Sequence, residues 1–351
     1  MSRRGGPSWR RPATRRQLLL GMAVGMGGAA GLSLARHQSG GEGLSGAVAE
    51  EVRGVDRPST FRYQRPDGPV SVIPPRREFY IDAEAGAQQT FGDLYLPATA
   101  NPSLPVVILI HGGGWSKELG LEYMGKLAED LASFDVAVWN IEYRRIGSGG
   151  GWPTTVQDVC SAVDYLQDID KQMGGRLDLE RVAVCGHSSG GHLALWVAGR
   201  ERLPANLPGG KPKQVVSHCV SLAGVADLVS AEESGDRYLK DLLGTTLSDN
   251  RDLFVQASPI AHLPTGCQVV TIHGENDDVV LPSQSRAYVD AARAAGDDAR
   301  LEIVPGGNHD PWTDIRQSPW KRARTILLSQ LRVPGSSLTV TTPTTTAPAN
   351  P

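Results

Sequence analysis

Short apolar runs alternate with helical patterns along the middle of this 351-residue chain, and this alternation constrains the fold more than any other feature. The runs at 106–110 and 136–141 are almost wholly apolar, as buried strands of a parallel sheet are. Strands separated by helices predict an α/β fold, a mostly parallel twisted sheet with helices on both faces. The other expected elements are strands at 181–185, 215–222, 269–273 and 301–304, helices at 153–166, 191–199, 283–295 and 320–331, and an antiparallel pair at 78–81 and 90–96.

The first 35 residues have the pattern of an export signal. A twin arginine, Arg15-Arg16, directly precedes the uncharged, glycine-diluted stretch 18–34, which resembles a twin-arginine translocation signal. We expect cleavage after Ala35 or Ala49 and export to the periplasm, the cell wall or the medium. A stable membrane helix needs about 20 predominantly apolar residues, so we expect no stable membrane insertion after signal removal. The alternative is an uncleaved N-terminal membrane anchor.

Two further segments lack apolar periodicity. Residues 36–76 are rich in Gly, Ser, Pro and charge and are predicted to form a flexible tether. Residues 333–351 are dominated by Thr and Pro and are predicted to be a disordered tail, with O-glycosylation left open. Between them we expect one domain at 77–332.

Charge is distributed unevenly along the chain. The first 41 residues hold seven arginines and no acidic residue, so the rest carries all 38 acidic residues against 28 basic ones. Binding to nucleic-acid phosphates needs a basic face. A nucleic-acid partner is therefore not expected.

A predicted strand runs into Gly186-His187-Ser188-Ser189-Gly190 and then into a predicted helix. In that context Gly-x-Ser-x-Gly is typical of a nucleophile elbow, a sharp strained turn on which the serine hydroxyl stands above the sheet. Gly186 and Gly190 are the residues that such a turn requires. Ser188 is therefore the candidate nucleophile, and it needs a base and a group that orients the base.

Two later strands end in suitable partners. The strand at 269–273 leads into an acidic turn with Asp277 and Asp278, and the strand at 301–304 leads into a loop with His309. The order Ser, Asp, His at the carboxyl ends of strands fits Ser188, Asp277 and His309 as nucleophile, orienting acid and general base. Asp278 remains the rival acid.

An earlier strand ends in His111-Gly112-Gly113-Gly114-Trp115. Glycines without side chains let backbone N–H groups point at a developing negative charge. The predicted oxyanion donors are Gly113, Gly114 and the N–H of Ser189, with Gly112 serving the turn. We expect His111 to brace this loop and Trp115 to complete the motif.

These motifs together resemble the α/β-hydrolase superfamily, most closely its esterase and lipase branch with the His-Gly-Gly-Gly oxyanion motif. The resemblance covers about 78–331 and includes Glu142-Tyr143-Arg144 and His273-Gly274-x-x-Asp277, where the family places the acid. One departure is Leu281, where the family often has proline. His111 to Trp115 also satisfies the His-Gly-Gly-x-Trp pattern of kynurenine formamidase-like members.

Cofactor and metal chemistry are not expected. No His-Glu-x-x-His or Cys/His spacing is present, so a catalytic zinc is not predicted. The remaining histidines near the motifs, His187, His192, His218 and His273, are interpreted as structural. The four cysteines fall on apolar strands, an apolar helical face or a strand border, where free thiols behave as small hydrophobes, and no obligatory disulfide is expected.

The resulting hypothesis is an exported, cofactor-free serine hydrolase that cleaves small-molecule carboxylic esters through an acyl-enzyme. One alternative is a kynurenine formamidase-like amidase. Another, from a different class, is a non-catalytic binding protein that retains the fold. The insertion at 225–266 mixes apolar with charged residues and is expected to form a small helical cap that selects the substrate.

Overall fold

An eight-stranded sheet forms the centre of the computed structural model, which describes residues 68–81 and 88–333. The strand order is β1-β2-β4-β3-β5-β6-β7-β8; β2 runs antiparallel to both of its neighbours, β1 and β4, and the other neighbouring pairs are parallel. The predicted α/β architecture is confirmed. The strands are β1 (Val72–Phe79), β2 (Phe91–Pro97), β3 (Leu104–Ile110), β4 (Ala137–Ile141), β5 (Leu177–His187), β6 (His218–Leu222), β7 (Gln268–Gly274) and β8 (Ala299–Val304).

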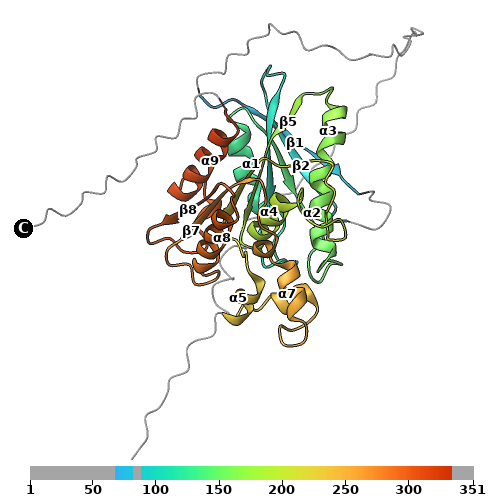
Figure 1. Cartoon of the computed structure of the whole chain (residues 1–351). Helices are drawn as coiled ribbons and strands as arrows, with labels where there is room; N and C mark the ends of the chain where they lie inside the picture. The colour runs from blue at the N-terminus through green and yellow to red at the C-terminus, as the bar shows by residue number, and fades with distance from the viewer. Residues whose placement is uncertain (1–67, 82–87, 334–351) are drawn as a thin grey trace, which may run out of the picture. The chain divides into compact units, whose positions relative to one another are not determined.

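Helices cover both faces of this sheet (Figure 1). On one face, α1 (Gly125–Ala132) and α9 (Ser318–Gln330) pack against strand residues such as Val107 and Leu109. On the other, the strand residues Val106 and Ile108 meet the remaining long helices. These helices are α2 (Thr154–Asp164), α3 (Leu166–Gln172), α4 (Ser189–Gly199) and α8 (Ser283–Ala294). Because β3 is covered on both faces, all of its residues are buried, and its apolar run follows from this position.

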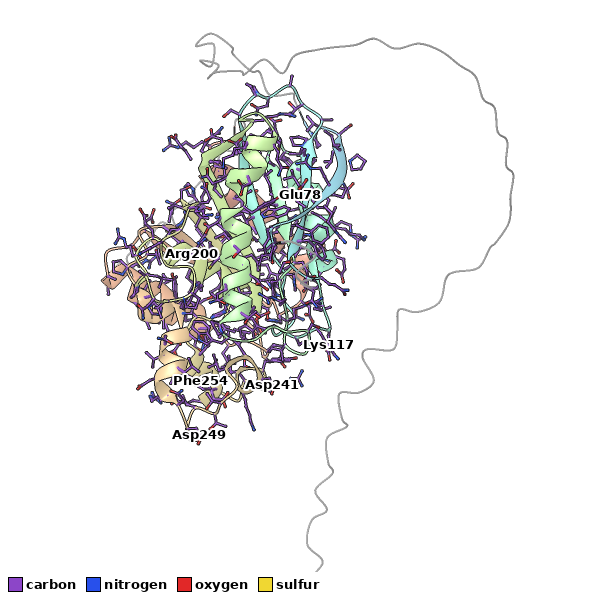
Figure 2. The ribbon with its side chains drawn as sticks, turned by 90° about the vertical axis from the view of Figure 1, so that its right-hand side faces the viewer. Glu78, Lys117, Arg200, Asp241, Asp249 and Phe254 are labelled. Carbon is purple, nitrogen blue, oxygen red and sulfur yellow. The ribbon has the colours of Figure 1, made fainter. Side chains whose placement is uncertain are left out.

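The predicted insertion is helical. It contains α5 (Leu228–Glu233), α6 (Leu239–Leu243), α7 (Arg251–Ala257) and the 3-10 helix η3 (Pro259–His262). Asp227 and Asn250 cap α5 and α7 by accepting backbone N–H bonds. Figures 1 and 2 place the insertion at one end of the molecule, with Lys117 toward the same end and Glu78 of β1 toward the other. The two other 3-10 helices are η2 (Leu121–Met124) and η4 (Pro311–Thr313).

Several element boundaries differ from the predictions. β1 starts at Val72, inside the predicted tether, because an edge strand tolerates Pro74 and Pro75 at a register shift between Ile73 and Arg76. The helix predicted to begin at Pro153 is divided at Tyr165 into α2 and α3.

One helix was not predicted, and one core residue was assigned to the tail. Helix α1 was not predicted, although Leu127, Ala128, Leu131 and Ala132 have helical spacing and are buried. Val333, assigned to the tail, is buried in the core.

The predicted signal at 1–35, most of the tether and residues 334–351 of the tail lie outside the described residues. Within the part of the chain that the structure describes, no helix has both the length and the apolar character needed to cross a bilayer.

The four cysteines give a test of how the core is stabilised. Cys160, Cys185, Cys219 and Cys267 are buried free thiols, and burial raises the pKa of Cys160 to about 11. We expect a reductant to change the melting temperature by less than about 1 °C, and iodoacetamide to label none of the four in the folded protein. Differential scanning fluorimetry and mass spectrometry measure these effects; a drop of several degrees under reductant would contradict the assignment of free thiols.

Candidate active site

Ser188 occupies the sharp turn between β5 and α4. Its backbone has φ 56° and ψ −121°, a conformation that L-residues rarely adopt and that costs of order 1–3 kcal/mol. Glycines on both sides are obligatory. A Cβ on Gly186 would lie 2.0 Å from the Gly190 carbonyl oxygen, and one on Gly190 would lie 2.2 Å from that of Ile110. The turn therefore presents the Ser188 hydroxyl at the carboxyl edge of the sheet.

The structure brings Ser188, His309 and Asp277 together from three separate loops. His309 Nε2 lies 2.9 Å from Ser188 Oγ, and His309 Nδ1 lies 2.7 Å from Asp277 Oδ2. The Asp277 side chain is fully buried and that of His309 nearly so. Since a carboxylate only accepts hydrogen bonds, His309 carries its proton on Nδ1 and turns the Nε2 lone pair toward the serine.

Asp277 is held as an anion. Burial raises the pKa of its carboxyl group, but the hydrogen bonds from His273 and His309 outweigh burial and leave the pKa well below its usual range. The carboxylate also accepts the N–H groups of Val279 and Val280. The rival acid Asp278 is exposed on the same turn. Geometry therefore favours Asp277 as the partner of His309.

Two neighbouring histidines support the loops that carry these residues. His273 directs its Nε2–H at the Val280 carbonyl, at 2.8 Å, and at Asp277 Oδ2, at 3.3 Å, while its Nδ1 accepts a bond from Ser285 Oγ at 2.8 Å. His187 donates from Nε2 to the main-chain oxygen of His309 at 3.0 Å. Burial lowers the pKa of His187 to about 3, so this ring is neutral beside His309. Both were interpreted as structural from the sequence, which did not reveal their partners.

The loop of Gly112, Gly113 and Gly114 lies directly against the elbow. A Cβ on Gly112 would be 2.8 Å from the His187 carbonyl oxygen and 3.2 Å from Ser188 Cβ. Gly113 and Gly114 have φ 114° and 62°, values that favour glycine. Among residues 68–81 and 88–333, their N–H groups donate to no acceptor, which leaves both amides free for a ligand. Ser189, the residue after Ser188, begins α4, and its N–H is the third predicted oxyanion donor.

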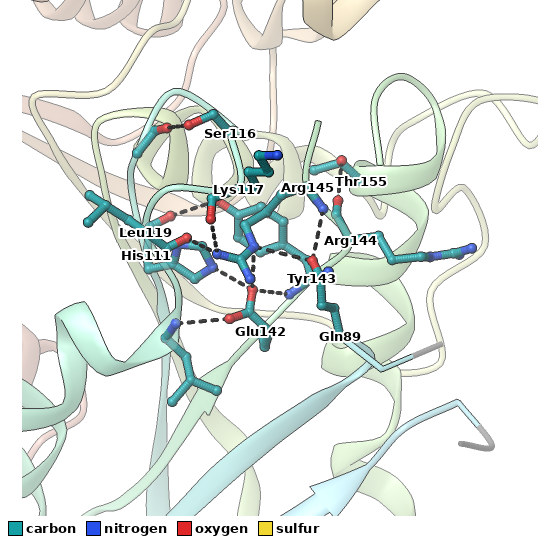
Figure 3. Close-up of polar contacts among 12 residues, drawn as sticks. Gln89, His111, Ser116, Lys117, Leu119, Glu142, Tyr143, Arg144, Arg145 and Thr155 are labelled. Carbon is teal, nitrogen blue, oxygen red and sulfur yellow. Dashed lines mark hydrogen bonds and ion pairs between the residues drawn. The ribbon is translucent and has the colours of Figure 1, made fainter. Parts of the chain in front are cut away.

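Glu142, directly after β4, ties the loop from His111 to Trp115 to its surroundings (Figure 3); this loop is called the oxyanion loop below, after the role predicted for its amides. Its buried carboxylate accepts bonds from His111 Nε2 at 2.9 Å and from the Leu121 N–H at 3.1 Å. Arg145 Nε lies 3.3 Å from the same carboxylate. The sequence motif Glu142-Tyr143-Arg144 marked this position, but only the structure shows that the glutamate contacts the loop.

The insertion also contacts the oxyanion loop. A Cβ on Gly114 would lie 2.8 Å from ring atoms of Tyr238, which precedes α6. Trp115 is buried and meets the His192 ring edge to face at 5.3 Å, and His192 donates to the Ala257 carbonyl at the end of α7. The insertion therefore packs on the residues that surround Ser188.

The His and Asp side chains of this region are of types that can also bind metal ions. Within the described ranges, no group of three or more His, Cys, Asp or Glu side chains is arranged to hold a metal ion. The clustered His and Asp side chains of the site are instead hydrogen-bonded to one another and to the backbone.

Comparison with solved structures supports the fold. A bifunctional GH43-CE protein of Bacteroides eggerthii is 25% identical, with a TM-score of 0.62 over 72% of this chain and 38% of that one. The esterase Est2 of Thermogutta terrifontis is 20% identical, with a TM-score of 0.59 over 73% of this chain and 92% of that one.

Comparison with known sequences identifies the family. Esterase LipQ of Mycobacterium tuberculosis is 29% identical over 198 residues, 55% of this chain and 46% of that protein, so the chain spans about half the length of such relatives. A kynurenine formamidase of Danio rerio is 26% identical over 224 residues, 62% of this chain and 69% of that protein. The model of the BD-FAE family matches residues 92–291, more than half of the chain. The chain therefore belongs to the BD-FAE family of α/β-hydrolase esterases.

Proposed function

We propose that this protein is an exported serine hydrolase that cleaves small carboxylic esters through an acyl-enzyme. The observation that carries the proposal is the continuous hydrogen-bonded chain from Ser188 Oγ through His309 to the buried anion Asp277. A serine hydroxyl is a weak nucleophile until a base takes its proton, and this arrangement supplies the base in the required tautomer.

In the proposed mechanism, His309 Nε2 takes the Ser188 proton while Oγ attacks the ester carbonyl carbon. The resulting oxyanion accepts hydrogen bonds from the N–H groups of Gly113, Gly114 and Ser189. His309 then gives its proton to the departing alkoxide, which leaves as the alcohol. A water molecule, deprotonated by His309, attacks the acyl-enzyme, and the proton returns to Ser188 as the acid is released.

The relatives favour ester hydrolysis over other acyl-transfer reactions. LipQ is named an esterase, and other relatives are named a probable carboxylic ester hydrolase and an isoprenylcysteine methylesterase. The second candidate is a formamidase, since kynurenine formamidases are among the relatives and the same nucleophile and base would serve both reactions.

Apolar side chains around the site favour a substrate with an apolar part. Leu119 packs beside Gly113 and is partly exposed, and Val279 and Leu281 are exposed just after Asp277. Between this acidic turn and the insertion lies a cavity of about 110 Å³ lined by Val225, Asp236, Val280 and their neighbours. We assign selection of the substrate to these exposed apolar side chains, to the residues that line the cavity and to Tyr238 of the insertion.

Replacement of the nucleophile tests the reaction. Ser188→Ala should lower kcat for a short p-nitrophenyl ester by about 10⁶-fold and abolish both the burst of p-nitrophenol and labelling by a fluorophosphonate. Ser161→Ala, a serine on α2, is the control and should label as the wild type does. An unlabelled wild-type Ser188 would favour a non-catalytic binding protein, and faster turnover of N-formylkynurenine than of every ester would favour the formamidase.

The buried carboxylate predicts a pH-dependent contribution to stability. The pKa of Asp277 is lower in the folded than in the unfolded protein, so its contribution is present above about pH 4 and is lost as the pH falls further. Asp277→Asn should lower kcat about 10⁴-fold at pH 7 and destabilise the protein there, and this difference in unfolding free energy should shrink below pH 4. Urea unfolding at several pH values measures it. The matched control is Asp278→Asn; if that variant lost activity instead, the acid would be misassigned.

Export is proposed from the amino-terminal sequence. Replacing Arg15-Arg16 by two lysines should retain the full-length protein in the cytoplasm of a bacterium with twin-arginine transport. The control replaces Arg10-Arg11, which does not adjoin the apolar stretch, and should leave export intact. Cell fractionation and immunoblotting provide the measurement. Unchanged export of the first variant would refute the twin-arginine signal, and exported protein that pellets with membranes would indicate an uncleaved anchor.

A further inference from the structure

The His111 ring is fully buried, and both of its nitrogens face hydrogen-bond acceptors. Nε2 lies 2.9 Å from Glu142 Oε1, and Nδ1 lies 2.8 Å from the Gly112 carbonyl oxygen. A carbonyl oxygen cannot donate, and an ionised carboxylate cannot either. Only a ring with a hydrogen on both nitrogens satisfies both contacts, so the geometry calls for a cationic His111.

Glu142 is ionised in this arrangement. Burial raises the pKa of its carboxyl group, but the hydrogen-bond donors around it outweigh burial and lower the pKa; besides His111 these are the Tyr143 N–H and Arg145. The oxygen facing His111 also accepts the Tyr143 N–H at 3.0 Å, and the other accepts the Leu121 N–H. Burying this anion is tolerable because it is surrounded by donors.

The His111 ring is held in one orientation. It stacks on Tyr143 with ring centres 4.3 Å apart and planes 4° apart, and the Tyr143 hydroxyl donates to the His111 carbonyl at 3.0 Å. Arg145 closes the far side of the network by donating to the carbonyls of Lys117 and Leu119 (Figure 3). The imidazole cannot turn away from the Gly112 carbonyl without breaking these contacts.

The Gly112 carbonyl belongs to the same planar peptide unit as the Gly113 N–H, one of the proposed oxyanion donors. A hydrogen bond from a cation to the oxygen of a peptide draws electron density from its nitrogen and makes the N–H a stronger donor. The effect is largest where water is excluded, as it is around the buried His111 and Glu142. The positive charge also lies one peptide unit from the place where the oxyanion would form.

We propose that His111 and Glu142 form an ion pair that polarises the Gly112–Gly113 peptide and so strengthens the Gly113 N–H as an oxyanion donor. This inference rests on the proposed serine hydrolase function. Neither side chain touches the substrate: both act as positioning residues through the peptide. A pair that only braced the loop would contribute to folding without a specific preference for the transition state.

Two substitutions at His111 separate its contact with Glu142 from its contact with the Gly112 carbonyl. His111→Gln places an amide N–H where Nε2 contacts Glu142 and loses the donor to Gly112, whereas His111→Asn places an N–H where Nδ1 contacts Gly112 and loses the contact with Glu142. The Thr155 hydroxyl donates to the Arg144 carbonyl, two residues beyond Glu142, and takes no part in the contacts of His111 described above. Thr155→Val removes this hydroxyl and is the control for loss of loop bracing alone.

The readouts are kcat and KM for p-nitrophenyl acetate and the Ki of a trifluoromethyl ketone, whose adduct with Ser188 resembles the tetrahedral state. Loss of a complete oxyanion donor costs about 10²–10³ in kcat, so weakening one should cost less. We expect His111→Gln to lower kcat about tenfold and raise Ki in the same proportion, with KM within about twofold of the wild type. His111→Asn should be less impaired, and Thr155→Val should lose stability while kcat and Ki both keep their wild-type values.

Two outcomes would overturn the inference while leaving Ser188 as the nucleophile: equal kcat and Ki in His111→Gln and the wild type, or a loss confined to KM. A wild type that neither turns over esters nor reacts with a fluorophosphonate would instead overturn the proposed function. If the His111 variants do not fold, ¹⁵N NMR of the histidine-labelled wild-type chain decides. Two protonated nitrogens on His111 at pH 7 support the pair, and a neutral ring contradicts it.

Discussion

Direct contact between two backbone turns, without side chains between them, is the constraint on which the rest of the site depends. Gly190 lies so close to the end of β3 that a Cβ there would meet the carbonyl oxygens of Ile110 and His111 at 2.2 and 2.4 Å. Gly112 also lies against the elbow, where a Cβ would be 2.8 Å from the His187 carbonyl oxygen. Because these turns touch, the Ser188 hydroxyl and the amides of the oxyanion loop are held together, and the packing offsets the strain at Ser188.

Few side chains around this contact are charged. His187 is buried and neutral, its pKa lowered mainly by burial, and His273 is satisfied by a carbonyl on one nitrogen and a hydroxyl on the other. The neutral His187 ring therefore does not repel His309 when that ring becomes cationic. The buried anion Asp277 contacts His309, and His111 contacts both Glu142 and the Gly112 carbonyl. In the proposed mechanism, Asp277 would stabilise the imidazolium of His309, and the cationic His111 would act on the oxyanion through the Gly112–Gly113 peptide.

The fold could be predicted from the sequence, and so could Ser188, Asp277 and His309, because each of these residues follows a strand and carries a local signature. Gly-x-Ser-x-Gly, the acidic turn and the histidine loop are all read from neighbouring residues. The contacts of Glu142 and His187 could not be predicted from the sequence, because they join segments far apart in the chain. Glu142 contacts His111 and Leu121, and His187 contacts His309. The start of β1 was missed for another reason: Pro74 and Pro75 argue against a strand in the sequence, and only the edge position makes them acceptable.

The insertion, for which we propose a role in substrate selection, also packs against the oxyanion loop. Tyr238 packs against Gly114, and Ala257 at the end of α7 accepts the bond from His192, whose ring contacts Trp115. A change at Tyr238 or near Ala257 would therefore also alter the packing on these loop residues. The Glu142 network contacts the loop from the opposite side through His111 and the carbonyls of Lys117 and Leu119. With that side anchored, the insertion can change at residues away from Tyr238 while the amides of Gly113 and Gly114 keep their place.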